Sequence, residues 1–499
     1  MAKRNVILIT IDSLRRDFLG CYGYAENISP VIDGLAEKGV RFENVWANSG
    51  NTPNAFKSIM TGKYPLQEPG YGVFEKQDYL PYIFKKEGYR TIGIVAGNPL
   101  VSRYYGYGKG FDIFFDFMDK RESAIETKNS LSKITTALRH ACKWISYQIG
   151  TSFYVFFISR LYELIRKGYG YDVWPHRFSY KKVISQLEST LNSNNWANCP
   201  DKIFMWLHFM DVHHPYGRPE GMSESICQCL HDLINFQDRA NRVPKKRINV
   251  AITAKIRRMY EQSIRDMDCG LKELLSVLSR YRLLEDSSVF ILSDHGDLLG
   301  EHGLLGHRRL LFNELLKIPA IVYEDESSGS DKVYREPVSQ RDIYKLILLS
   351  KDRAVSKLIR EPISYNEEIF SEMYCDEYGG MFMDGHKYFI NLFKLDETAR
   401  RLYSLVKGDK KLTYQQYNNQ YIFSDLFDNV LDISQNGKLV YQDMFKILHQ
   451  HIHKEQADRK IAKQRHLLRA TVKKVVDNLK MNSKDKEQDM AGESKFASR

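Results

Sequence analysis

Acidic residues and a histidine follow two apolar runs that lie far apart in the sequence. Asp12 comes directly after residues 5–11, and Asp294 and His295 come shortly after residues 288–292. Carboxylate oxygen and imidazole nitrogen together suit Zn²⁺ or Mn²⁺, whereas Mg²⁺ and Ca²⁺ need more oxygen ligands. Asp12 could equally serve as the N-cap of a helix. The three side chains are candidate metal ligands.

A hydroxyl group stands where a helix is expected to begin. Thr52 is followed by Pro53, a residue favoured in the first turn of a helix, and the helical spacing continues over residues 55–60. A threonine in this place ordinarily caps the helix. Beside a metal ion, however, a hydroxyl at a helix N-terminus can be ionised and aimed at a tetrahedral phosphorus or sulfur centre. Thr52 is therefore also a candidate nucleophile.

Histidines follow a third apolar run, residues 202–207. His208 comes next, and His213 and His214 lie in the segment H-F-M-D-V-H-H-P-Y. Imidazoles close to a strand end can hold anionic oxygens or protonate a leaving group. Neighbouring side chains of an extended segment point to opposite sides, so we expect at most one histidine of this adjacent pair to enter a site.

The segment after Asp294 offers further groups. Gly296 allows a close approach of other backbone. His302 and His307 lie near enough in the sequence to reach the same pocket.

The elements that would position these residues alternate between strand and helix. We expect strands at residues 5–11, 91–95, 202–208, 288–292 and 319–323, and helices at 29–38, from 55 onward, at 79–87 and at 256–279. This alternation is typical of an α/β fold with a doubly wound, mostly parallel sheet sandwiched by helices. The carboxyl ends of parallel strands are where ligands bind, which is where Asp12 and Asp294 would lie.

Three regions follow from the change of pattern along the chain. We expect an α/β catalytic domain over 1–345 with a helical insert at about 118–195, a smaller C-terminal α+β part over 346–448, and a basic helix with a disordered tail over 449–499. Short strands are expected in the smaller part at 369–374, 380–383 and 387–391, and helical spacing continues from 449 to 480.

The insert contains an uncharged stretch, residues 144–159, within a longer apolar segment at 143–166. This stretch is shorter than the roughly 18–20 apolar residues of a spanning helix. Two interpretations remain: a helix packed over the rim of the site, or an interfacial helix that rests on a membrane or on a lipid-linked substrate.

Composition narrows the class of protein. The 499 residues include seven scattered cysteines, from which we expect reduced thiols. The first apolar run is too short for the core of a signal peptide. We therefore expect a cytoplasmic protein, which could also contact a membrane peripherally. The formal charge is +11, and residues 454–499, with 13 Lys/Arg against 7 Asp/Glu, supply +6 of it. Because no recognition motif accompanies this local basicity, we expect no nucleic-acid partner.

Taken together and in order, the motifs resemble the sulfatase family of the alkaline-phosphatase superfamily. They are D-S-L-R, G-C-Y-G-Y, S-P-V-I-D-G-L-A-E-K-G-V-R-F, T-P-x-x-F-x-x-I-M-T-G-x-Y-P, H-F-M-D-V-H-H-P-Y and S-D-H-G-D-L-L-G-E-H-G-L-L-G-H. The resemblance covers roughly residues 4–325 and implies an alkaline-phosphatase-like fold that acts on an anionic ester of a small molecule, glycan or lipid.

The resemblance also implies roles for individual residues. Asp12, Asp294 and His295 fall on ligands of a divalent metal, with Zn, Mn, Mg and Ca all open, and Thr52 falls on the nucleophile that joins them at the metal. His213 falls on the substrate-binding histidine, and His307 stands where many sulfatases have a lysine that binds the anion or donates a proton. Arg15 and Gly23 are structural members of their motifs.

Two departures from the family pattern direct the choice of reaction. Ser13 stands where sulfatases have a second aspartate, and Thr52, Asn54 and Phe56 replace the Cys or Ser, Pro and Arg required for conversion to formylglycine. Threonine cannot form that aldehyde, so the site looks more like that of the phosphoethanolamine and glycerophosphate transferases and the phosphodiesterases of the superfamily. The alternatives are a sulfuric-ester hydrolase, a non-catalytic binder of anionic glycans or lipids, and a basic scaffold acting through residues 454–499.

Overall fold

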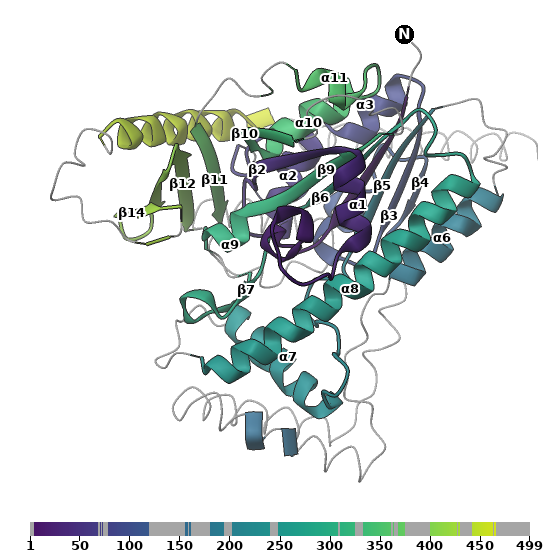
Figure 1. Cartoon of the computed structure of the whole chain (residues 1–499). Helices are drawn as coiled ribbons and strands as arrows, with labels where there is room; N and C mark the ends of the chain where they lie inside the picture. Colours follow the sequence, from purple (N-terminus) through teal and green to yellow (C-terminus); the bar gives the residue numbers. More distant parts are fainter. Residues whose placement is uncertain are drawn as a thin grey trace, which may run out of the picture.

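The structure is a computed structural model of the whole chain, shown in Figure 1. It describes residues 4–67, 70, 72, 78–118, 155–157, 159–160, 180–193, 202–239, 248–307, 310–324, 333–360, 363, 368–374, 400–426, 428–429, 442–462 and 464–465.

An eight-stranded sheet forms the centre of the molecule, with the strand order β10-β2-β9-β6-β1-β5-β3-β4. Its strands in sequence order are β1 (Asn5–Ile11), β2 (Val40–Trp46), β3 (Arg90–Val95), β4 (Ile113–Phe115), β5 (Ile203–Phe209), β6 (Ser287–Ser293), β9 (Lys317–Tyr323) and β10 (Val333–Ser339). The neighbouring pairs are parallel except for those of β9, which runs antiparallel to both β2 and β6. The expected mostly parallel sheet is confirmed. Strand β9 was expected as a further strand of this sheet, and its antiparallel direction was not predicted.

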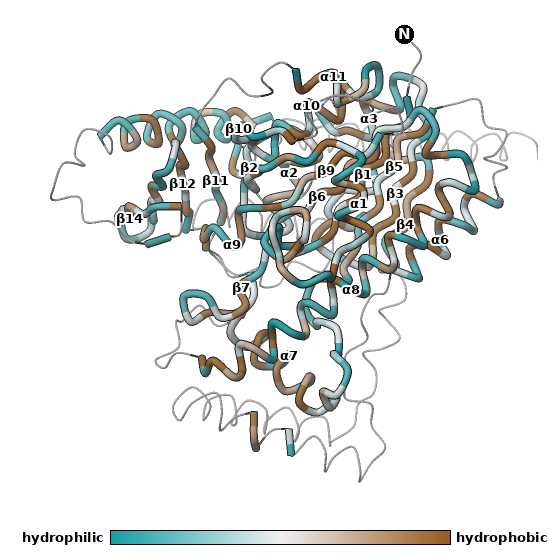
Figure 2. Tube along the Cα trace, in the orientation of Figure 1, coloured by the Kyte–Doolittle hydropathy of each residue, from teal (hydrophilic) through white to brown (hydrophobic). Residues whose placement is uncertain are grey.

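Helices cover both faces of this sheet (Figure 1). One face packs against α1 (Pro30–Lys38), α6 (Tyr180–Ser193) and α8 (Val250–Arg280), and the other against α2 (Thr52–Thr61), α3 (Leu80–Lys86) and α10 (Gln340–Leu349). Helix α7 (Glu224–Arg239) lies beside α8, away from the sheet (Figure 1). Alternate residues of β1 point to the two faces. Ile7 and Ile9 lie in the hydrophobic core under α1, α6 and α8, and Val6 and Leu8 lie in the core under α2, α3 and α10. Figure 2 shows the resulting hydrophobic character of the central strands. Because both faces are covered, every residue of β1 is buried, and four successive apolar residues stand where a strand with one exposed face would alternate.

Three strands end side by side at one edge of the sheet. Ile11 pairs with Phe209 of β5 and with Ser293 of β6, so the residues that follow these three positions lie at the same edge. Asp12, Met210 and Asp294 are the residues that directly follow these three positions in the chain. The register therefore brings Asp12 and Asp294 together, as expected for the carboxyl ends of parallel strands.

Short elements connect the main ones. They are the 3₁₀ helices η1 (Arg16–Phe18), η2 (Gly20–Tyr22), η3 (Pro99–Val101), η4 (Arg103–Tyr105) and η7 (Glu301–Gly303), the two-stranded ribbon of β7 (Leu298–Leu299) and β8 (Leu305–Gly306), and the helices α9 (Asn313–Leu316) and α11 (Val355–Leu358).

A separate antiparallel sheet follows in the C-terminal part, which confirms the expected α+β character. Its strands are β11 (Glu368–Tyr374), β12 (Arg401–Lys407), β13 (Lys410–Gln415) and β14 (Gln420–Asp425), and a helix over 442–462 packs on it through Met444, Leu448 and Ile452. The strand expected at 369–374 is present as β11. The strands expected at 380–383 and 387–391 lie outside the described residues, as do residues 466–499 with the expected tail.

The insert is described only in part. Helix α6 is its one long described helix, and most of 144–159 lies outside the described residues. Within that stretch, Val155 is buried, whereas Phe156 and Phe157 are exposed. In the described part of the chain, no helix combines the length and apolarity needed to cross a bilayer.

Candidate functional site

Thr52 is the first residue of α2, and its hydroxyl is not the cap of that helix. Asn51 is the N-cap, and its side-chain oxygen accepts a hydrogen bond from the backbone N–H of Asn54. The buried Thr52 Oγ1 instead lies 3.1 Å from His295 Nε2 and 3.5 Å from Asp12 Oδ2. The structure thus excludes the capping interpretation and places the hydroxyl between two of the candidate metal ligands.

Asp12 is fully buried at the end of β1 and does not cap a helix either. Its Oδ1 accepts from the Ser13 hydroxyl at 2.9 Å, and its Oδ2 accepts from Asn98 Nδ2 at 3.0 Å. Burial alone would raise the pKa of Asp12, but the neighbouring His213, His208 and His295 outweigh it and hold this pKa well below its usual range. Asp12 is therefore a carboxylate.

Asp294 is a buried carboxyl group with one unsatisfied oxygen. Its Oδ1 accepts from the backbone N–H groups of Ser13 at 3.2 Å and His295 at 2.9 Å, while its Oδ2 has no hydrogen-bond partner among the described residues. Burial, and then the charge of Asp12, raise the pKa of Asp294 well above its usual value. Two buried carboxyl groups at such close range need a cation between them for both to be charged.

His295 completes this group. Its Nδ1 lies 2.8 Å from the carbonyl of Gly296, so that nitrogen carries the proton and Nε2 presents a lone pair toward Thr52. Burial lowers the pKa of His295 to about 4, which keeps the ring neutral, as a metal ligand must be.

The donor atoms of Asp12, Asp294 and His295 fit a divalent metal ion. One ligand atom from each residue lies within 4.8 Å of the others, and all three side chains are buried. Two carboxylates and one imidazole are ligands of the kind that Zn²⁺ and Mn²⁺ accept, and the unsatisfied Asp294 Oδ2 is an atom that an ion would satisfy.

A second cluster holds His213, His214 and His307, whose ligand atoms also lie within 4.8 Å of one another. The rings of His213 and His214 stack with centroids 4.2 Å apart, and His307 lies 5.0 Å from His213 and 4.7 Å from His295. The expectation that only one of the adjacent histidines enters the site was wrong. The segment is a turn, closed by a hydrogen bond from His213 N–H to Met210 O, and adjacent side chains of a turn can face the same way.

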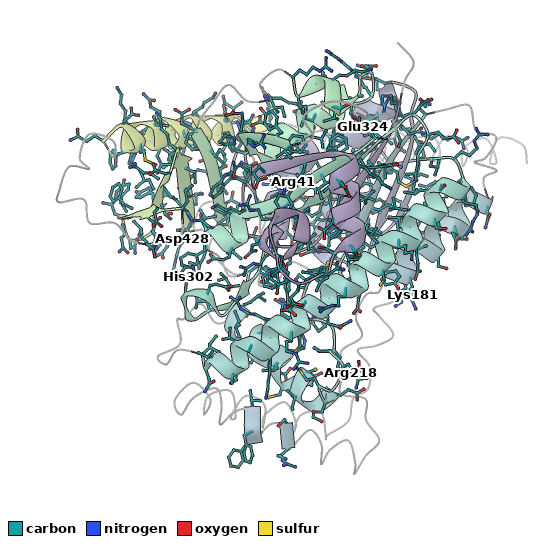
Figure 3. All side chains as sticks on the ribbon, in the orientation of Figure 1. Arg41, Lys181, Arg218, His302, Glu324 and Asp428 are labelled. Carbon is teal, nitrogen blue, oxygen red and sulfur yellow. The ribbon has the colours of Figure 1, made fainter. Side chains whose placement is uncertain are left out.

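His302 does not join the pocket that His307 reaches. Its Nε2 lies 3.2 Å from Glu314 Oε2, and its ring stacks on Phe312. Glu314 raises the pKa of His302. Figure 3 labels His302 and Asp428 on the side of the molecule where the small sheet adjoins α9, and Asp428 pairs with Lys411 Nζ at 2.7 Å. These contacts give His302 a structural place at the junction of the two sheets.

Three residues near the site were not assigned a role from the sequence. Asn98 follows β3 and donates to Asp12, and Asp297 is a fully buried acid that accepts from Tyr216 OH. Gln340 Nε2 donates to the carbonyl of Asp294 at 2.8 Å. The strand-end rule that found Asp12 could have found Asn98, because β3 lies next to β5 in the sheet. Gln340 follows β10, a strand that was not predicted.

Arg15 and Gly23, the motif residues expected to be structural, make contacts or adopt a conformation of that kind. Arg15 forms ion pairs with Asp17 at 2.7 Å and Glu301 at 2.9 Å, and Gly23 has a left-handed φ of 99°. A Cβ at Gly296 would lie 2.0 Å from Glu314 O, so the close backbone approach inferred at this glycine is present.

Comparisons with known proteins agree with the geometry. A family model described as Sulfatase matches residues 4–348. An arylsulfatase of Clostridium perfringens is 23% identical over 387 residues, which cover 69% of this chain and 74% of the relative. The fold is similar to that of the phosphonate monoester hydrolase of Agrobacterium radiobacter, with a TM-score of 0.61 at 16% identity, covering 91% of this chain and 96% of the other. The fold is also similar to that of a protein solved in complex with its substrate D-glucosamine-2-N,6-O-disulfate, with a TM-score of 0.56 at 15% identity, covering 92% of this chain and 98% of the other. The alkaline-phosphatase-like fold is confirmed, and the match of the family model over more than half of the sequence shows that the chain belongs to the sulfatase family.

Proposed function

We propose that this protein is a metal-dependent hydrolase or transferase of anionic esters that uses Thr52 as its nucleophile. The observation that carries the proposal is the position of Thr52 Oγ1, buried within 3.1 Å of His295 Nε2 and 3.5 Å of Asp12 Oδ2. A hydroxyl used only for structure would be expected to bond the helix backbone, and Asn51 already fills that role.

The residues divide into three roles. Asp12, Asp294 and His295, with Thr52, would hold a divalent ion, whose chemistry at this place is to lower the pKa of the hydroxyl. The Thr52 oxygen attacks the phosphorus or sulfur, the bond from that atom to the substrate's alcohol breaks, and the alcohol leaves with a proton. Water or an acceptor alcohol then attacks the covalent ester and frees the Thr52 hydroxyl. His213 and His307 lie beside this position and would hold the equatorial oxygens or donate a proton to the leaving group.

We favour a phosphorus ester over a sulfate ester. The formylglycine mechanism needs a Cys or Ser in place of Thr52 and an Arg in place of Phe56. Phe56 instead packs its buried ring against His208 and Trp206, with centroids 5.0 Å and 5.5 Å away, so an apolar ring stands where that mechanism needs a guanidinium group.

Sulfate-ester hydrolysis is the second candidate, because the family model and the arylsulfatase similarity favour it. The substrate classes in view are small-molecule, glycan or lipid-linked esters. A relative that binds such an ester without turnover is the remaining alternative, and the replacement of an aspartate by Ser13 is the feature in its favour.

One substrate panel tests the proposal. The full-length protein, loaded with Zn²⁺ or Mn²⁺, is assayed on p-nitrophenyl phosphate, bis-p-nitrophenyl phosphate, a p-nitrophenyl phosphonate and p-nitrophenyl sulfate. We expect turnover of a phosphorus ester, a loss of at least about 10³-fold in kcat for Thr52→Ala, and partial retention for Thr52→Ser, since serine keeps the hydroxyl. Sulfate as the best substrate would favour the second candidate, and full activity of Thr52→Ala would rule out the mechanism.

A further inference from the structure

A further group of metal-ligating side chains lies outside the candidate active site, where η7 and α9 adjoin the small sheet. Its members are His302 of η7, Glu314 of α9 and Asp428, which follows β14. One ligand atom from each residue lies within 4.8 Å of the others. Figure 3 labels His302 and Asp428 on this side of the molecule. Three separate elements thus bring an imidazole and two carboxylates together.

The spacing of the ligand atoms suits a tetrahedral ion. His302 Nε2 lies 3.2 Å from Glu314 Oε2. Ligand atoms at roughly 2.0–2.1 Å from a tetrahedral Zn²⁺ lie about 3.4 Å apart, so a small movement of these two side chains would admit the ion. The side chains of His302 and Glu314 are 25% and 21% exposed, which lets an ion enter from solvent, whereas that of Asp428 is 5% exposed.

Neighbouring residues hold the ring of His302 and the carboxylate of Asp428 in place. The His302 ring stacks on Phe312 with centroids 3.8 Å apart. Asp428 Oδ1 accepts from Lys411 Nζ at 2.7 Å, and Oδ2 accepts from the backbone N–H of Asn313 at 2.6 Å. A carboxylate oxygen has two lone pairs, so each oxygen keeps one for a metal. Carboxylates that bind metals generally accept hydrogen bonds of this kind, which orient them.

The charges around His302 favour a cation. Its hydrogen bond to Glu314 raises the pKa of His302, against the effect of burial, and the charges of Asp428 and Glu301 act in the same direction. In the metal-free protein this cation is the proton on the ring, which a divalent ion would replace. Because Lys411 already balances Asp428, we expect Mn²⁺ and Ca²⁺, which need more oxygen ligands, to bind more weakly than Zn²⁺.

We propose that His302, Glu314 and Asp428 form a Zn²⁺-binding site that joins the small sheet to η7 and α9. Water would take the remaining position of the ion. The site goes beyond the proposed function, because none of its three residues is assigned a part in turnover. It would tie the C-terminal sheet to the ribbon of β7 and β8, in which η7 is the connection.

Zinc counting on the full-length protein tests the site. The protein is freed of metal with a chelator and titrated with Zn²⁺, and bound metal is counted by native mass spectrometry and calorimetry. We expect His302→Gly and Glu314→Gln each to bind one Zn²⁺ fewer than the wild type. Glycine suits the left-handed backbone of His302, whose φ is 55°. His453→Ala removes an exposed histidine of the helix over 442–462 and is the matched control, which should bind the wild-type number.

A difference of one ion is counted, so the result does not depend on whether the candidate active site also binds Zn²⁺. Chemical modification of the wild type adds a readout that needs no variant. Diethylpyrocarbonate modifies exposed imidazoles, and mass spectrometry maps them. We expect Zn²⁺ to protect His302 and to leave the modification of His453 unchanged. Equal Zn²⁺ counts in the wild type and both variants, or equal modification of His302 with and without Zn²⁺, would overturn the site and leave His302 and Glu314 as an ion pair.

Discussion

Replacing Asp294 by Asn should stabilise the metal-free protein and remove its stabilisation by Mn²⁺. Asp294 Oδ2 is buried and has no hydrogen-bond partner in the part of the chain that the structure describes, and burial and the charge of Asp12 raise the pKa of Asp294. A buried polar group without a partner costs about 1–3 kcal/mol, and more when it is charged. At pH 8 and without metal, the Asp294→Asn protein should therefore be more stable than the wild type by about 1–3 kcal/mol.

The same reasoning fixes the pH dependence. Because the folded-state pKa of Asp294 is raised, its contribution to stability is complete below the pKa of an unfolded aspartate and is lost as the pH rises through the folded-state value. The metal-free wild type should lose stability as the pH rises above about 4, and Asp294→Asn should lose less.

Unfolding by urea, followed by circular dichroism with EDTA and with Mn²⁺, measures both effects. Mn²⁺ prefers oxygen ligands, and at a concentration of 100 times its Kd it should add about 2.7 kcal/mol to the wild type and almost nothing to Asp294→Asn. Asp268→Asn is the matched control: this buried acid accepts from the backbone N–H groups of Val31 and Ile32 and is not one of the candidate metal ligands, so its replacement should leave the Mn²⁺ effect intact. A metal-free Asp294→Asn protein that is less stable than the wild type, or that is still stabilised by Mn²⁺, would refute the reasoning.

Three further changes give distinct results. Ser13→Asp restores the family's second aspartate next to Asp12, and calorimetry should show Ca²⁺ binding tightened roughly tenfold, about 1.4 kcal/mol, since Ca²⁺ gains an oxygen ligand; unchanged or weaker binding would contradict this. Asn98→Ala removes the 3.0 Å hydrogen bond to Asp12 Oδ2 and should weaken Mn²⁺ binding about 10–100-fold, whereas an unchanged affinity would show that Asn98 does not orient the ligand. Burial and the charge of Glu372 raise the pKa of Glu455 to about 8, so its contribution to stability is lost as the pH rises from about 4.5 through 8. Urea unfolding should show a flatter pH profile for Glu455→Gln, and an identical profile would show that this acid does not titrate as inferred.

The central sheet could be predicted because its strands are buried on both faces. β1, β5 and β6 are continuous apolar runs bounded by polar residues, and their predicted and observed limits differ by a residue or two. The direction of β9 could not be read from the sequence, because an apolar run looks the same in either direction. Strands β12, β13 and β14 were not predicted. β14 is largely half-exposed and gives no apolar run, but this reason does not apply to β12, whose central residues are buried.

The part of the candidate site that could be predicted consists of reactive side chains that directly follow the end of a strand. Asp12, Asp294 and His295 meet beside Thr52, as the strand-end rule requires. The placement of His213 beside His214 was not predictable, because it depends on a turn whose geometry no spacing rule gives. Asp297 and Gln340 act by contacts with residues far away in the chain, and the sequence carries no local signal for such contacts.

The nucleophile is the central claim, and a trapped covalent intermediate tests it most directly. The full-length metal-loaded protein is mixed with its best p-nitrophenyl substrate, quenched in acid within the first turnovers, digested, and mapped by mass spectrometry. We expect a phosphoryl, phosphonyl or sulfuryl ester on the peptide that carries Thr52, and no such ester in Thr52→Ala. An ester on a different residue, or steady turnover with no modified peptide while the substrate is in excess, would contradict the account.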